Sequence, residues 1–133
     1  YRSYKTGTGH SDFSELSPEY LKPSTTIRWQ KPAIVLTNRG CYSATNTFVR
    51  DMLCCPNVRT LGDRTGGGGG MPFTSELPNG WLVRFSSCPQ YDKQKQHIEF
   101  GIPPTIPCEL KAEDVAKGKD TLIEAARKLL RER

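Results

Sequence analysis

The pattern of apolar and polar positions changes its period between residues 33 and 61. Residues 33–37 form a short run rich in β-branched side chains, closed by the turn-forming Asn38-Arg39-Gly40, which predicts a buried strand. Apolar side chains then recur at helical spacing, at Ala44, Phe48, Met52 and Cys55. We expect a helix that turns this face to the core and ends at Pro56. Residues 58–61 predict a second strand, so that strand, helix and strand form a parallel, right-handed βαβ unit.

Two more elements are predicted downstream, and the start of the chain is predicted to be irregular. Residues 73–77 and 81–85 flank Pro78-Asn79-Gly80, which is typical of a β-hairpin. A terminal helix with Asp120 as its N-cap is predicted by an apolar stripe. The stripe consists of Leu122, Ile123, Ala126, Leu129 and Leu130. Residues 1–28 show little periodicity, so we expect an irregular lead-in that continues an upstream part of the parent protein, with the α/β fold in residues 29–133.

Composition and charge narrow the classes of function. The chain has 133 residues, enough for one domain, and a formal net charge of +5. Its basic residues are scattered among acidic ones without aromatic-interleaved motifs, so we expect no nucleic-acid partner. No apolar run approaches the roughly 20 residues that a membrane-spanning helix needs, so we expect no membrane span. The five cysteines lack the paired CxxC spacing of a zinc site, and we expect no metal or other cofactor. Buried free thiols are favoured for these cysteines, and a single disulfide bond between two of them is the alternative.

Ser43 is the main candidate for chemistry because it follows the first strand and its turn and stands at the start of the predicted helix. A serine hydroxyl becomes a nucleophile only when a base takes its proton and donors stabilise the resulting oxyanion. Free backbone N–H groups at a helix start supply such donors, and Ala44 carries the nearest one. The alternative is a plain helix cap, a role that serine often has. The Gly-x-Ser-x-Gly elbow of the α/β-hydrolases is absent here.

A run of five glycines, residues 66–70, is the second unusual feature. Met71-Pro72 follows it, where a phosphate-binding P-loop needs Gly-Lys-Ser/Thr, and no helix is predicted there for a dinucleotide site. We therefore expect no nucleotide. Such a run lets the backbone lie close to a substrate, and we take Gly66, Gly67 and Gly68 as the substrate loop; a merely flexible loop is the alternative.

Several segments in consistent order, covering roughly residues 30 to 130, resemble the C-terminal half of the catalytic domain of the S41 serine peptidases. They are Pro32-Ala-Ile-Val-Leu-Thr-Asn, Cys41-Tyr-Ser-Ala, Leu61-Gly-Asp-Arg-Thr-Gly-Gly, Leu77-Pro-Asn-Gly and Glu99-Phe-Gly-Ile-Pro-Pro. The resemblance implies a partial ClpP/crotonase-like β-α superhelix. It also implies hydrolysis of peptide bonds near protein C-termini in peptide or protein substrates, and location outside the cytoplasm, in the periplasm or cell envelope. It leaves the substrate's identity and the oligomeric state open.

Carried over to this sequence, the resemblance makes Ser43 the nucleophile and the Ala44 amide one oxyanion donor. The processing proteases place a lysine base near the position of Gly68, so this chain has no Ser-Lys dyad. The tricorn-like branch instead uses a Ser-His-Ser-Glu tetrad, and Glu99 fits the glutamate.

The histidine and the second oxyanion donor of that branch belong upstream, and neither His10 nor His97 stands in the histidine's place. We therefore expect a truncated catalytic domain that is inactive alone. The alternative is a catalytically degenerate relative that only binds peptides. Thr105 replaces an acid that the family usually has there.

Overall fold

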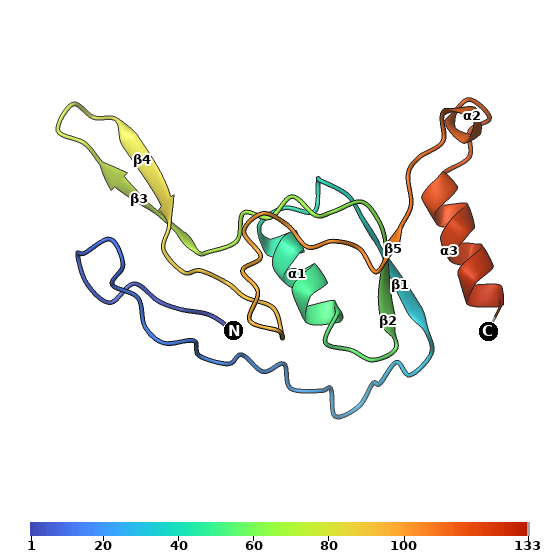
Figure 1. The fold of residues 1–133 in the computed structure, drawn as a ribbon, viewed down its shortest axis with the longest axis horizontal. Helices are drawn as coiled ribbons and strands as arrows, with labels where there is room; N and C mark the ends of the chain where they lie inside the picture. The colour runs from blue at the N-terminus through green and yellow to red at the C-terminus, as the bar shows by residue number, and fades with distance from the viewer. Residues whose placement is uncertain (133) are drawn as a thin grey trace.

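A three-stranded parallel sheet forms the centre of the chain, as the predicted βαβ unit requires. The structure, a computed structural model, describes residues 1–132. The strands β1 (Ala33–Thr37), β2 (Val58–Gly62) and β5 (Ile106–Pro107) lie in the order β1-β2-β5. Ala33 lies opposite Val58, and α1 (Ala44–Met52) makes the crossover between the two longer strands. The predicted strand, helix and strand are therefore confirmed (Figure 1).

The face that α1 turns to the core differs from the predicted one. Val49 is only 1% exposed and packs with Ile98, Ile102 and Val35, whereas Phe48 is 51% exposed. The predicted stripe through Ala44 and Phe48 is thus wrong. The inner face also carries buried polar side chains, whose partners lie far away in the sequence, so apolar spacing alone selects the wrong side of the helix.

One of these polar side chains, Asn46, ties α1 to two distant loops. Asn46 is 0% exposed; its Nδ2 donates to the Ile98 carbonyl at 3.1 Å, and its Oδ1 accepts from Thr65 Oγ1 at 2.6 Å. Thr65 Oγ1 in turn accepts from the Ile102 amide at 2.6 Å. Buried polar groups are stable only when paired, so this network holds the glycine run and residues 98–102 in a fixed position around α1.

The remaining elements lie outside this centre. The hairpin of β3 (Pro72–Glu76) and β4 (Leu82–Ser86) is antiparallel, as predicted, and extends away from the sheet (Figure 1). After the short α2 (Ala112–Val115), the helix α3 (Thr121–Arg131) packs against β1 and β2, on the other side of the sheet from α1. Asp120 Oδ1 accepts from the amides of residues 122 and 123 at 2.8 and 3.1 Å, which confirms the predicted N-cap.

The lead-in has no helix or strand beyond isolated bridges, yet charged contacts fasten it to α1. Arg2 forms antiparallel bridges with Ser17 and with Gln90. Its Nε lies 2.6 Å from Glu19, whose other oxygen lies 2.9 Å from Arg50 Nη1 on α1. The lead-in therefore reaches the helix that begins at Ser43, a connection that its irregular sequence does not predict.

All five cysteines are free, but only one of them is buried. Cys88 is 2% exposed, and burial raises the pKa of its thiol, although the nearby Arg2 charge acts in the opposite direction. Cys54 and Cys55 are exposed, so the expectation of buried thiols is wrong for these two. Among the helices of residues 1–132, none is both long and apolar enough to cross a bilayer.

Candidate active site

Ser43 has a backbone conformation that is uncommon for a residue with a side chain. Its φ is 57° and its ψ is −118°, at the position just before α1. The Ser43 amide donates to the Gly67 carbonyl at 2.8 Å, and the Ser43 carbonyl accepts from the Thr47 amide at 3.1 Å. Positive φ at a non-glycine residue costs on the order of 1–3 kcal/mol and persists only where the surrounding structure enforces it. These two hydrogen bonds, one on each side of the residue, enforce it here.

The Ser43 hydroxyl makes no capping bond and no other hydrogen bond within the described residues. Ser43 and Ala44 line a groove of about 290 Å³, together with Thr47, Gly69 and Gly70. The Ala44 amide likewise finds no acceptor in the part of the chain that the structure describes. A free hydroxyl and a free helix-start amide therefore border the same groove, which is the arrangement that attack on a carbonyl and stabilisation of its oxyanion require.

The first three glycines of the run connect Ser43 to Glu99. The Gly66 amide donates to the Cys41 carbonyl at 2.9 Å, and the Gly68 amide donates to the Glu99 carbonyl at 3.0 Å. Gly67 has a φ of 75° and lies against the Glu99 carbonyl, where a Cβ would clash. These glycines thus hold the backbone between the two proposed catalytic residues. Gly69 and Gly70, rather than Gly66–Gly68, line the groove in the described residues, so substrate contact by the first three stays a prediction.

The glycine segment lies between the backbones of Ser43 and Glu99, because the Gly67 carbonyl accepts from the Ser43 amide at 2.8 Å and the Gly68 amide donates to the Glu99 carbonyl at 3.0 Å. Glu99 is half-buried, and its carboxylate has no hydrogen bond or ion pair within residues 1–132. It does not line the groove. The Glu99 carboxylate therefore does not contact Ser43 directly within the described residues.

Neither histidine of the chain lies at the groove. His97 is exposed, with its ring centroid 5.2 Å from that of Tyr91, and His10 is exposed in the lead-in. Arg2 is the only charged side chain among the described residues that line the groove. The structure therefore brings Ser43 and Ala44 together and places Glu99 nearby, without a base beside the hydroxyl in the part of the chain that it describes.

Sequence reasoning missed two groove residues, Arg2 and Gln90. Thr47 Oγ1 donates to Gln90 Oε1 at 2.8 Å, and Gln90 is the antiparallel bridge partner of Arg2. Both lie in segments without periodicity, so no apolar pattern marks them. In the sequence, Arg2 follows Tyr1, and Gln90 stands between Pro89 and Tyr91. A polar residue in an irregular stretch is too weak a signal to single out either of them.

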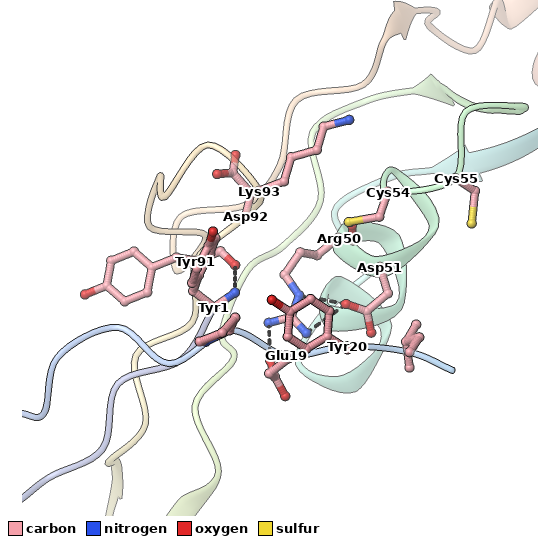
Figure 2. Close-up of a pocket in the computed structure, with 12 residues that line it drawn as sticks. Tyr1, Glu19, Tyr20, Arg50, Asp51, Cys54, Cys55, Tyr91, Asp92 and Lys93 are labelled. Carbon is pink, nitrogen blue, oxygen red and sulfur yellow. Dashed lines mark hydrogen bonds and ion pairs between the residues drawn. The ribbon is translucent and has the colours of Figure 1, made fainter. Parts of the chain in front are cut away.

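A larger cavity, of about 410 Å³, lies elsewhere, beside the C-terminal half of α1 (Figure 2). Figure 2 shows Arg50 held between Glu19 and Asp51, with Cys54 and Cys55 in the turn that follows the helix. Arg50 is 6% exposed, and ion pairs with Glu19 and Asp51 balance its charge within the chain. Ser43 does not line this cavity.

The geometry of Ser43 does not by itself name a class of enzyme, and comparison with known proteins identifies the family. The family model of peptidase family S41 matches residues 2–108, and the chain belongs to this family. No match was found among curated proteins.

Solved structures agree with this assignment. A Parabacteroides merdae protein described as a "putative peptidase" is 58% identical over 98% of this chain, with a TM-score of 0.93. Mature CPAF in complex with lactacystin is 22% identical over 80% of this chain, with a TM-score of 0.67. The tricorn protease is 22% identical over 76% of this chain, with a TM-score of 0.61. This chain spans 41%, 21% and 10% of those three chains, so it has part of an S41/tricorn-like peptidase fold.

Proposed function

We propose that this chain is the C-terminal part of the catalytic domain of an S41 serine endopeptidase and that Ser43 forms its acyl-enzyme. The observation that carries the proposal is the positive φ of Ser43, which costs free energy and leaves the hydroxyl unpaired in a groove beside the free Ala44 amide. A residue that only capped α1 would use its hydroxyl to bond a helix amide, and Ser43 does not.

In the proposed reaction, Ser43 Oγ attacks the carbonyl carbon of the scissile peptide bond while a base takes the hydroxyl proton. The carbonyl oxygen becomes an oxyanion, which the Ala44 amide and a second donor stabilise. The C–N bond then breaks, the amine leaves with the proton from the base, and an acyl ester remains on Ser43. Water hydrolyses this ester and releases the second product.

The base is proposed to be a histidine from upstream residues of the parent protein, oriented through a second serine by Glu99. Three observations support this relay: the Gly67-Gly68 backbone is hydrogen-bonded to both Ser43 and Glu99, the Glu99 carboxylate is unpaired within the described residues, and the chain spans 41% of a relative that is 58% identical. The isolated chain is accordingly inactive. From the family resemblance, the same proposal includes three further properties: a ClpP/crotonase-like superhelix, cleavage near protein C-termini and location outside the cytoplasm.

The test is labelling of the complete protein with a fluorophosphonate, followed by peptide mapping. We expect the phosphonyl group on Ser43 and no labelling of the Ser43→Ala variant. Ser75→Ala, at an exposed serine of β3, is the matched control and keeps full labelling. Labelling or peptide hydrolysis that survives Ser43→Ala would show that another residue is the nucleophile.

A second candidate is a catalytically degenerate peptide-binding module. It is favoured by one observation: no histidine or lysine lines the groove among the described residues. In that case the complete protein binds peptides in the groove, Ser43 stays unlabelled, and Ser43→Ala changes neither result.

A further inference from the structure

Among residues 1–132, the wall of the Ser43 groove carries a single charged side chain, and it is positive. Among the described residues that line the groove, Arg2 is the only charged side chain, and the others are small, apolar or neutral polar. No carboxylate of the described residues lies on this wall, so a negative group in the groove meets no fixed charge of its own sign there. A substrate group next to Ser43 therefore meets one positive group on this wall, and Glu19, the carboxylate paired with that group, does not line the groove.

The Nε of the Arg2 guanidinium is paired with a carboxylate, whereas its two terminal nitrogens have no strong partner within the described residues. Its Nε faces Glu19 at 2.6 Å, and that carboxylate is shared with Arg50. Nη1 approaches only the Met71 sulfur, at 3.4 Å, and neither Nη1 nor Nη2 donates to an oxygen within residues 1–132. A thioether is a weak acceptor, so the outer edge of the guanidinium keeps its strong donors free.

The backbone around Arg2 fixes this orientation. The Arg2 amide donates to the Ser17 carbonyl at 2.9 Å, and the flanking Ser3 amide donates to the Pro89 carbonyl at 3.0 Å. Burial acts to lower the pKa of Arg2, but the Glu19 charge and hydrogen bond raise it overall, so the guanidinium remains positive. A positive group held in place before the ligand arrives binds with less loss of conformational entropy.

Gln90 adds a second donor on the same wall. It is the bridge partner of Arg2, so the two side chains extend from the same face of a strand pair. Its Oε1 is occupied by Thr47 Oγ1 at 2.8 Å, while its Nε2 donates to no described residue although Gln90 is only 5% exposed. Thr47 thereby orients the amide so that the free group is the donor.

We propose that Arg2 and Gln90 form a subsite that binds a carboxylate group of the substrate beside the peptide bond attacked by Ser43. A planar guanidinium with a neighbouring amide donor matches the acceptor oxygens of a carboxylate. This inference rests on the proposed peptidase or peptide-binding function and adds the substrate class: peptides with an acidic residue next to the scissile bond, or with their terminal carboxylate there.

The experiment measures peptide binding, because binding does not depend on catalysis. The complete protein carrying Ser43→Ala is titrated with fluorescent peptides that differ only in Glu, Gln or Lys at one of the two positions flanking the scissile bond. These three peptide sets have amidated C-termini. A fourth set carries Gln and a free C-terminus, which distinguishes a side-chain carboxylate from the terminal carboxylate of the peptide.

We expect the Glu peptide, or the peptide with the free C-terminus, to bind at least about tenfold more tightly than the amidated Gln peptide, as a charge-assisted hydrogen bond predicts. Adding Arg2→Met removes this difference, whereas Arg127→Met, at an exposed arginine of α3, preserves it. Equal affinities for all peptides, no measurable binding, or a preference that survives Arg2→Met would each overturn the inference.

These outcomes are distinct from failure of the proposed catalysis. If the wild-type protein labels Ser43 with fluorophosphonate but shows no carboxylate preference, only the subsite is wrong. If the preference is present and depends on Arg2 while Ser43 stays unlabelled, the subsite stands and the protein is a binding module.

Discussion

Replacement of Ser43 by glycine should stabilise the protein relative to replacement by alanine, although both remove the hydroxyl. At φ 57° and ψ −118°, any residue with a Cβ is strained by on the order of 1–3 kcal/mol. Glycine removes this strain, and its greater freedom in the unfolded chain costs about 0.5–1 kcal/mol. Ser43→Gly is therefore expected to exceed Ser43→Ala in free energy of unfolding by roughly 1 kcal/mol, within limits of about 0 and 2.5 kcal/mol. Ser43→Ala itself stays close to the wild type, because the hydroxyl makes no capping bond that could be lost.

The measurement is urea unfolding of the three proteins, followed by far-UV circular dichroism because both tryptophans are already exposed in the folded chain, with the slope of the transition checked for constancy. Ala116→Gly is the control, because Ala116 is exposed and has a φ of −61° and a ψ of −23°, a conformation that alanine adopts without strain. There we expect a loss of about 0.5–1 kcal/mol, opposite in sign to the change at Ser43. If glycine at position 43 proves no more stable than alanine, the backbone there is not strained, and the main support for the nucleophile assignment is lost.

Three further predictions concern the cap of α3, the proposed relay and the thiols. Asp120→Ala should lower the free energy of unfolding by about 1 kcal/mol because two amide hydrogen bonds are lost, and Asp120→Asn should restore most of it in the same urea assay. Glu99→Gln in the complete protein should lower kcat by about tenfold or more with little change in KM, since we propose that Glu99 orients the catalytic histidine and it does not line the groove; an unchanged kcat would remove it from the relay. Iodoacetamide should modify the exposed Cys54 and Cys55 before Cys88, because the raised pKa of Cys88 gives less thiolate at a given pH and its burial limits access. Mass spectrometry over time at pH 8 shows the order of modification. Early labelling of Cys88 would contradict its burial.

The elements of the fold are largely predictable from local sequence, because each is marked by a short-range signal. The run at 33–37, the turn at 78–80 and the cap at Asp120 act within a few residues, and the structure has the strand, hairpin and helix that they predict. The core face of α1 is not predictable in this way. It is set by Asn46, whose partners Thr65 and Ile98 lie 19 and 52 residues away in sequence and whose polarity excludes it from an apolar stripe.

The candidate site is likewise predictable from local sequence only in part. Ser43 and Ala44 follow from one local pattern, a strand, a turn and a helix start. The groove also depends on Arg2 and Gln90, which come together through an antiparallel bridge across 88 residues that no local pattern encodes. Residues positioned by pairing between distant irregular segments are visible only once the chain is folded.

The contact between the Tyr42 ring and Gly68 gives a physical reason why this chain has no lysine at position 68 for a Ser-Lys dyad. Gly68 has a φ of 70°, and a Cβ there would meet the ring of Tyr42, the residue just before Ser43. A lysine at this position would need both a strained backbone and a displaced tyrosine. The glycine run and the aromatic residue thus fit each other, so the loop beside Ser43 has no room for a side chain at position 68. The base that the proposed mechanism requires therefore comes from outside this loop.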